Sequence, residues 1–163
     1  MDRTRKISAS AILKATLLAG VLDILSAGLY AAIAGHNPVF VPVGIASAVW
    51  VGARHAPFAA IVVGLALHFC IMFVMVGAFA FASGRKPELA ERPVLVGTVY
   101  GLVLYAVMYL IVLPLRWPSL FPNFAVAGVV EELFSHIALV GIPIVWVIGR
   151  SMSLPLKDGL AHA

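Results

Sequence analysis

Four long apolar segments constrain the fold of this chain more than any other feature. They cover about residues 9–34, 57–82, 93–113 and 123–149. A helix needs about 20 mostly apolar residues to cross the hydrocarbon core of a bilayer, and each segment reaches that length. Backbone polar groups must be paired inside this layer, so each segment is expected to be helical. The sequence therefore predicts an all-α integral membrane protein, a four-helix transmembrane bundle in a single domain over residues 1–163.

The composition supports this class of protein. Of the 163 residues, 63% are hydrophobic and 11% are charged, whereas about a quarter of the residues in soluble domains are charged. The sequence pI is about 9.6, but the basic residues lie at the ends of the apolar segments, where they set membrane orientation. We therefore expect contact with the lipid bilayer and no nucleic-acid partner.

The first apolar segment resembles a cleaved signal peptide only at its basic start. Its apolar run continues to Ala34, which is long enough to span the membrane. Asp23 near its centre would also be unusual in the apolar core of a signal peptide. We interpret this segment as the first span.

A short segment, residues 36–54, separates the first two spans. Pro38 and Pro42 interrupt it, and residues 43–52 then form an apolar stretch. About ten residues cannot cross a bilayer. The sequence predicts a short interfacial or re-entrant helix here on the outer side, with Trp50 and Arg54 at the level of the headgroups.

The distribution of basic residues predicts the orientation. With four spans, both termini and the turn after the second span share one side of the membrane. That side holds nine of the eleven Lys and Arg residues, and the other side holds Arg54 and Arg116. Because basic residues concentrate on the cytoplasmic side, we expect a multi-pass protein of a bacterial cytoplasmic (inner) membrane with both termini in the cytoplasm.

Four ionisable residues are predicted to lie near the middle of the membrane: Asp23, His68, Glu132 and His136. At 1.5 Å per residue, His68 is roughly 16 Å beyond Pro57, within a hydrocarbon layer of about 30 Å. Glu132 and His136 share a helix face because they are four residues apart. Such residues are costly in hydrocarbon and usually face the interior of a bundle.

These four residues allow several chemistries. Carboxylates and imidazoles together suit a divalent metal such as zinc or iron, and they also suit a relay for protons. His68 and His136 are further compatible with the axial ligands of a b-type haem. A purely structural network of hydrogen bonds between helices is the remaining alternative. The sequence therefore leaves the cofactor open: it is compatible with a metal ion or haem and requires neither.

The sequence favours a function other than catalysis. It contains no serine elbow, Walker loop or paired-histidine zinc motif, so we expect no enzyme activity. Gly97 and Gly101 form a GxxxG pattern that allows close helix contact. The leading hypothesis is a small non-enzymatic accessory or self-associating subunit of a membrane complex. The alternatives are a proton or divalent-cation transporter that uses the four ionisable residues, and a haem-binding electron-transfer protein.

Several motifs in the last two thirds of the chain occur together: His68, Gly97-x-x-x-Gly101, Met108, Pro114-Leu115 and Glu132-x-x-x-His136. In this combination the chain resembles the YagU-like family of uncharacterised small bacterial inner-membrane proteins. The resemblance implies a small polytopic inner-membrane fold and directs attention to Glu132 and His136. It implies no particular biochemical activity.

Overall fold

The computed structural model describes residues 7–153, which form a bundle of helices. Four helices are long and apolar enough to span a membrane. The first is α1 (Ala9–Ile33) and the second is α3 (Pro57–Arg85). The third joins α4 (Pro93–Val107), η3 (Met108–Val112) and α5 (Leu113–Arg116), and the fourth joins α6 (Val126–Phe134), η4 (Ser135–Gly141) and α7 (Ile142–Ser153). The predicted fold class is confirmed: by helix length and hydropathy this is a multi-pass membrane protein.

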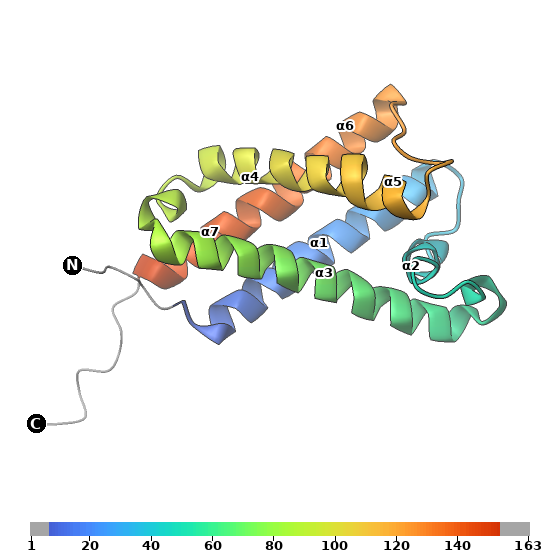
Figure 1. Ribbon diagram of the computed structural model, residues 1–163, viewed down its shortest axis with the longest axis horizontal. Helices are drawn as coiled ribbons and strands as arrows, with labels where there is room; N and C mark the ends of the chain where they lie inside the picture. Colours follow the sequence, from blue (N-terminus) through green and yellow to red (C-terminus); the bar gives the residue numbers. More distant parts are fainter. Residues whose placement is uncertain (1–6, 154–163) are drawn as a thin grey trace, which may run out of the picture.

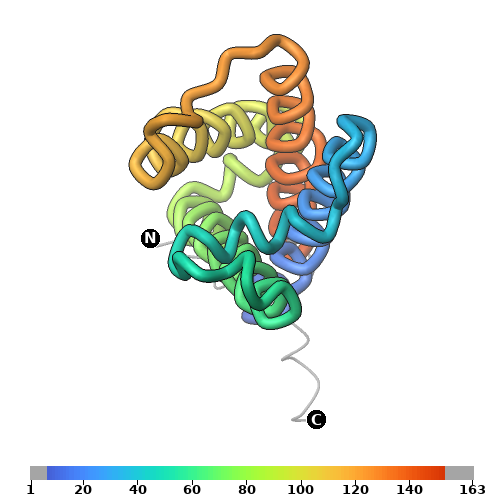
Figure 2. Tube along the Cα trace, turned by 90° about the vertical axis from the view of Figure 1, so that its right-hand side faces the viewer, coloured from blue at the N-terminus to red at the C-terminus, as the bar shows by residue number. Residues whose placement is uncertain are grey.

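The four spans form a ring that is open on one side. Helix α1 packs against α3 on one side and against η4 and α7 on the other, and α4 packs against η4 and α7. Figure 1 shows the start of α1, the end of α7 and the turn η2 (Pro87–Ala90) at one end of the bundle, and Figure 2 shows the helices nearly end-on, with the open side between α3 and the third span. This agrees with the predicted up-and-down topology. Arg3, Arg5, Lys6 and Lys157, which contributed to the predicted orientation, lie outside the described residues.

Helices α3 and α4 meet near the end of the bundle that carries η2. There the Tyr100 hydroxyl donates a 2.6 Å hydrogen bond to the Met75 carbonyl, and the rings of Phe79 and Tyr100 are 5.2 Å apart. Tyr100 therefore packs inside the bundle with its hydroxyl paired to the backbone of another span. Toward the opposite end, α3 and the third span do not pack extensively. A space lined by side chains from both spans therefore opens beyond Met75.

Two apolar clusters bracket this space. The larger one fills the half of the bundle near η2 and joins all four spans through residues such as Ala15, Val76, Leu104 and Ile144. The smaller one lies between the short helix and the start of α3 and consists of Val43, Ala46, Ala53 and Ala60. The larger cluster therefore stops short of the half of the bundle that carries α2.

The predicted short helix between the first two spans is confirmed, but its bounds differ from the expected ones. The expected stretch was 43–52, whereas α2 spans Phe40–Ala46. Pro42 lies in its first turn, where a missing backbone N–H breaks no helical hydrogen bond. Trp50 packs against the smaller apolar cluster, so this residue also has neighbours within the protein. The sequence predicts an interruption at Pro42, whereas this residue lies in the first turn of α2.

The third and fourth spans both contain a π-helical segment just before a proline. The segment η3 ends two residues before Pro114, and η4 ends two residues before Pro143. A proline removes one backbone N–H and its ring pushes on the carbonyl four residues earlier, so the preceding turn widens. In the fourth span this irregular segment occupies the seven residues Ser135–Gly141, which include His136.

The two glycines of the GxxxG pattern, Gly97 and Gly101, contact another span of the same chain. A Cβ added at Gly97 would lie 2.5 Å from the Cα of Ile142, and one added at Gly101 would lie 2.7 Å from the Cα of Ile137. Both distances are far shorter than van der Waals contact. These glycines therefore allow α4 to approach the fourth span closely, which brings η4 into the centre of the bundle.

Candidate functional site

The structure brings all four predicted residues to one cavity. This cavity has a volume of about 480 Å³ and lies in the half of the bundle that carries α2, with walls from every span and from α2. Asp23 comes from α1, His68 from α3, and Glu132 and His136 from the fourth span. The cavity occupies the open side of the ring, between α3 and η3. The expectation that these residues share one layer agrees with this arrangement.

Asp23 and His68 form a pair across the contact between α1 and α3. His68 Nδ1 is 4.0 Å from Asp23 Oδ2, and His68 Nε2 is 2.9 Å from the Gly20 carbonyl oxygen. A carbonyl can only accept a hydrogen bond, so Nε2 carries the hydrogen and Nδ1 faces the carboxylate. A neutral ring would then point a lone pair at Asp23. Attraction requires one additional proton, held either by Nδ1 or by the carboxyl group.

Gly20 is the residue that makes this pair possible. Its missing side chain leaves room for the ring of Phe69, which an added Cβ would meet at 2.6 Å. The close approach of α1 and α3 exposes the Gly20 carbonyl to the His68 ring. The edge of Phe69 in turn packs against that ring, with the ring centroids 5.2 Å apart. The orientation of His68 is therefore fixed by packing on two sides.

Glu132 and His136 form the second pair, within the fourth span. His136 Nδ1 donates a 2.9 Å hydrogen bond to the Glu132 carbonyl and lies 3.8 Å from Glu132 Oε2. The Tyr109 ring makes a T-shaped contact with the His136 ring, with centroids 5.9 Å apart, and Tyr109 lines the cavity together with Glu132. Because Nδ1 is committed to the backbone, the lone pair of a neutral His136 ring is on Nε2. Within the described residues, every fully buried side-chain nitrogen or oxygen has a hydrogen bond, so Nε2 must be accessible from the cavity.

A row of hydroxyls links the helices beside the two pairs. Ser26 and Ser135 are both buried, and their Oγ atoms are 3.0 Å apart. The Tyr30 hydroxyl lies 3.4 Å from Ser135 Oγ. Since Asp23, Ser26 and Tyr30 lie three and then four residues apart, they share one face of α1. This face of α1 therefore supplies a continuous polar strip toward η4.

Aromatic rings surround His136 and continue along the cavity wall. Tyr105 and Tyr109 are stacked with centroids 4.9 Å apart, and His136 meets each of them edge-on at about 6 Å. Tyr109 also packs against Phe121, with centroids 5.8 Å apart. Tyr30, Tyr109, Trp117 and Phe121 all line the cavity. Because Tyr109 contributes to this wall, it does more than fill space in the bundle.

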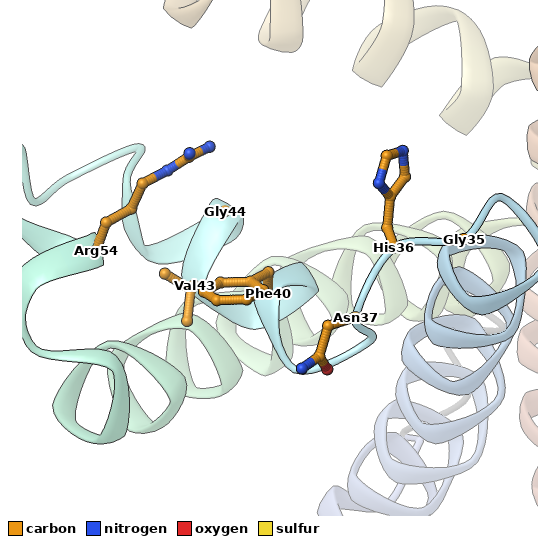
Figure 3. Close-up of a pocket in the computed structure, with 7 residues that line it drawn as sticks. All are labelled: Gly35, His36, Asn37, Phe40, Val43, Gly44 and Arg54. Atoms are coloured by element: carbon orange, nitrogen blue, oxygen red, sulfur yellow. The ribbon is translucent and has the colours of Figure 1, made fainter.

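Two arginines lie at the end of the cavity next to α2 and the segment that follows it. Arg116 donates hydrogen bonds from Nε to the Ala48 carbonyl at 2.7 Å and from its terminal nitrogen to the Ser47 carbonyl at 2.9 Å. Arg54 lies in η1 (Ala53–His55) and also lines a second cavity of about 480 Å³. Figure 3 shows Arg54 and His36 on the same side of this second cavity, with Gly44 between them. Gly44 and Arg54 contribute to both cavities, which are therefore neighbours.

The hydrogen bonds of Arg116 should hold the segment after α2 in place. Replacing Arg116 by Gln removes the charge and the forked donor, so amide hydrogen exchange at residues 46–50 is expected to accelerate roughly fivefold to tenfold. Arg54→Gln is the matched control, because Arg54 makes no hydrogen bond within residues 7–153. Hydrogen–deuterium exchange with mass spectrometry measures the effect. Equal exchange rates in the two variants would show that these hydrogen bonds do not restrain the segment.

The ionisable residues of the cavity are arranged as two separate carboxylate–histidine pairs. Within residues 7–153, no three His, Cys, Asp or Glu side chains gather closely enough to hold one metal ion. His68 Nε2 is hydrogen-bonded to the Gly20 carbonyl, and His68 Nδ1 lies beside Asp23. Neither ring nitrogen of His68 is therefore free to bind a haem iron in this arrangement. The zinc or iron site and the bis-histidine haem remain predictions from the sequence.

Sequence reasoning missed part of this site. The helical spacing of Asp23, Ser26 and Tyr30 was a signal that could have revealed the polar face of α1. The role of Tyr109 and the contact between Ser26 and Ser135 had no such signal, because both depend on how separate spans pack. Comparison with protein-family models, curated proteins and solved structures gives no match for this chain. The resemblance to the YagU-like family therefore stays a prediction.

Proposed function

We propose that this protein is a small proton-coupled transporter whose two carboxylate–histidine pairs take up and release protons inside the cavity. The pairs Asp23–His68 and Glu132–His136 would bind the protons, and the cavity would admit water from the outer side. With both termini in the cytoplasm of a bacterium, this outer side faces away from the cytoplasm. The proposal corresponds to the proton-transport alternative that the sequence raised.

The orientation of His68 is the observation that supports this function most strongly. Its Nε2 is held by a carbonyl, so its Nδ1 and Asp23 form a site for one exchangeable proton. A carboxylate and an imidazole that share a proton near mid-depth are the usual elements of proton relays in membranes. The side chains of Asp23 and Glu132 are 20% and 29% exposed, so water in the cavity can reach both carboxylates.

The accessory or self-associating role has less structural support. It relied on rows of small residues that would be available to other helices. Gly97, Gly101 and Gly141 instead pack against one another's helices inside this chain. Many apolar side chains are exposed on the outside of the bundle, but a lipid-facing surface has the same property. That role therefore stays a prediction without a specific contact surface.

Proton flux through purified protein tests the proposal. We expect proteoliposomes that contain the protein and a pH-sensitive dye to dissipate an imposed pH gradient faster than protein-free liposomes, with valinomycin and K⁺ present to prevent a build-up of charge. The assay is run without an added substrate, because the dye reports uncoupled proton leak through the cavity directly. The same measurement is repeated with an organic cation, phenyltrimethylammonium, added to the liposomes. Equal rates of proton flux with and without protein under both conditions would refute a proton-coupled function.

A further inference from the structure

We propose that the cavity binds a small organic cation, an amine or quaternary ammonium compound, between its carboxylates and its aromatic wall. This inference deepens the proposed function and rests on it only in assuming that the cavity is the transport site. The cation site itself follows from the charges and rings that line the cavity.

The deep end of the cavity carries acidic groups. Asp23 and Glu132 are the acidic residues in its lining, and both side chains are partly exposed to it. His68 and His136 are next to them, and each histidine has one ring nitrogen committed to a backbone carbonyl. An ionised carboxylate at this depth needs a positive partner. A bound organic cation would supply that charge when the pairs have released their protons.

The wall next to Glu132 is aromatic. Tyr109 lines the cavity together with Glu132, and its ring packs against Phe121 with centroids 5.8 Å apart. Trp117 packs against Phe121 in turn, with centroids 6.5 Å apart, but the guanidinium of Arg116 already lies over the Trp117 ring at 5.6 Å. The rings left for a bound cation are therefore those of Tyr109 and Phe121. The faces of such rings attract cations, most strongly where water is excluded, and aromatic walls are a recurrent way to bind quaternary ammonium groups. Aromatic rings beside a carboxylate therefore favour a bulky, weakly hydrated cation over a metal ion.

The size and remaining lining of the cavity fit such a ligand. Its volume of about 480 Å³ falls within the range of roughly 300–1,000 Å³ typical of small-molecule sites. Met72, Met75 and Met108 line it together with aliphatic side chains. Flexible thioethers adapt to ligands of different shape. The cavity can therefore surround the apolar part of an organic cation while the carboxylates meet its charge.

The positive groups lie at the end of the cavity next to α2. Arg116 directs its guanidinium to the Ser47 and Ala48 carbonyls, so its hydrogen-bonding groups are turned toward the backbone. Arg54 lies between this cavity and the second cavity, which is also lined by His36. These charges would attract an anion instead if this end of the cavity dominated binding. An anionic probe therefore belongs in the test.

The test compares three probes of similar shape and different charge. Isothermal titration calorimetry of the purified protein in detergent would use phenyltrimethylammonium, its neutral analogue tert-butylbenzene, and the anion benzenesulfonate. We expect the cation to bind at least about tenfold more tightly than either of the others, as expected for a desolvated charge with aromatic and carboxylate partners. Stronger binding of benzenesulfonate, or equal binding of tert-butylbenzene, would overturn the cation site.

Variants locate the bound cation. Glu132→Gln and Tyr109→Leu are expected to weaken binding at least about fivefold, whereas Tyr109→Phe keeps the ring and should retain most of the affinity. Glu131→Gln is the matched control, because Glu131 does not line the cavity. Unchanged affinity in folded Glu132→Gln protein would place the cation elsewhere and overturn the proposal.

The two proposals fail separately. Proton flux in proteoliposomes without selective cation binding would refute the organic-cation site and leave the proton-coupled function intact. Selective cation binding without any proton flux would support the site and refute the proton-coupled function.

Discussion

Replacing Glu132 by Gln is expected to reduce proton flux in proteoliposomes at least about tenfold, a loss typical of removing a group that transfers protons. Gln has nearly the same shape as Glu but cannot bind and release a proton near neutral pH. Glu132 lines the cavity beside His136, whereas Glu131 does not line it. Glu131→Gln is therefore expected to keep the proton flux within about twofold of wild type, because Glu131 is not part of the proposed proton path through the cavity.

This comparison is informative because the two residues are adjacent. Both are glutamates at nearly the same depth. If the loss of an acidic side chain disturbed folding or membrane insertion in general, both variants would therefore be affected. Size-exclusion chromatography and circular dichroism of both proteins establish that each is folded. Equal flux in wild type and Glu132→Gln, or an equal loss in both variants, would remove Glu132 from the proton path.

Replacing Gly101 by Leu is expected to destabilise the bundle by at least about 3 kcal/mol, at the upper end of what overpacking a core costs. A Cβ at this position would lie 2.7 Å from the Cα of Ile137 and closer still to the His136 carbonyl oxygen. Those contacts are with backbone, which cannot move aside as a side chain can. The fourth span would have to shift away from α4, and η4 would shift with it.

Gly128→Leu is the control for this substitution. Gly128 lies in α6, and a Cβ added there has nothing within 4 Å. Unfolding in mixed detergent micelles, followed by circular dichroism, measures the two free energies. We expect Gly128→Leu to change the free energy of unfolding by less than about 1 kcal/mol, as for most substitutions on a surface. Similar losses in both variants would mean that close contact at Gly101 does not hold the spans together.

The spans and their order could be predicted because they depend on local composition. Apolar length alone located all four helices, and the third and fourth differ from the predicted ranges by only a few residues at their ends. The depth of His68 and His136 followed from helical rise, which is constant along a regular helix. Their common cavity agrees with the depths derived in this way.

Features that depend on contacts between spans could not be predicted. The GxxxG pattern was expected to allow association, but the sequence could not distinguish contact with another protein from contact within the chain. The structure places Gly97 and Gly101 against the fourth span. The opening between α3 and η3 had no sequence signal either, since it reflects where packing ends. The cavity therefore emerged only from the arrangement of the spans.

The start of α2 shows a different limit. Pro42 lacks a backbone N–H, and the same residue can end one helix or occupy the first turn of another. Which of the two positions Pro42 occupies depends on how the residues around it pack against the rest of the protein. Here Gly64 on α3 has no side chain, which leaves room for the Pro42 carbonyl. Tertiary packing thus favours the helix Phe40–Ala46 over the stretch that composition suggested.

The protonation of the two histidine rings tests the central claim most directly. Nitrogen-15 NMR of histidine-labelled protein in lipid bilayers, at an alkaline pH where the rings are neutral, identifies which nitrogen carries the hydrogen; His68→Gln and His136→Gln assign the signals. We predict opposite tautomers: hydrogen on Nε2 in His68, bonded to the Gly20 carbonyl, and on Nδ1 in His136, bonded to the Glu132 carbonyl. A neutral His68 with its hydrogen on Nδ1 would contradict the account, because that ring would already donate to Asp23 and the pair would need no further proton.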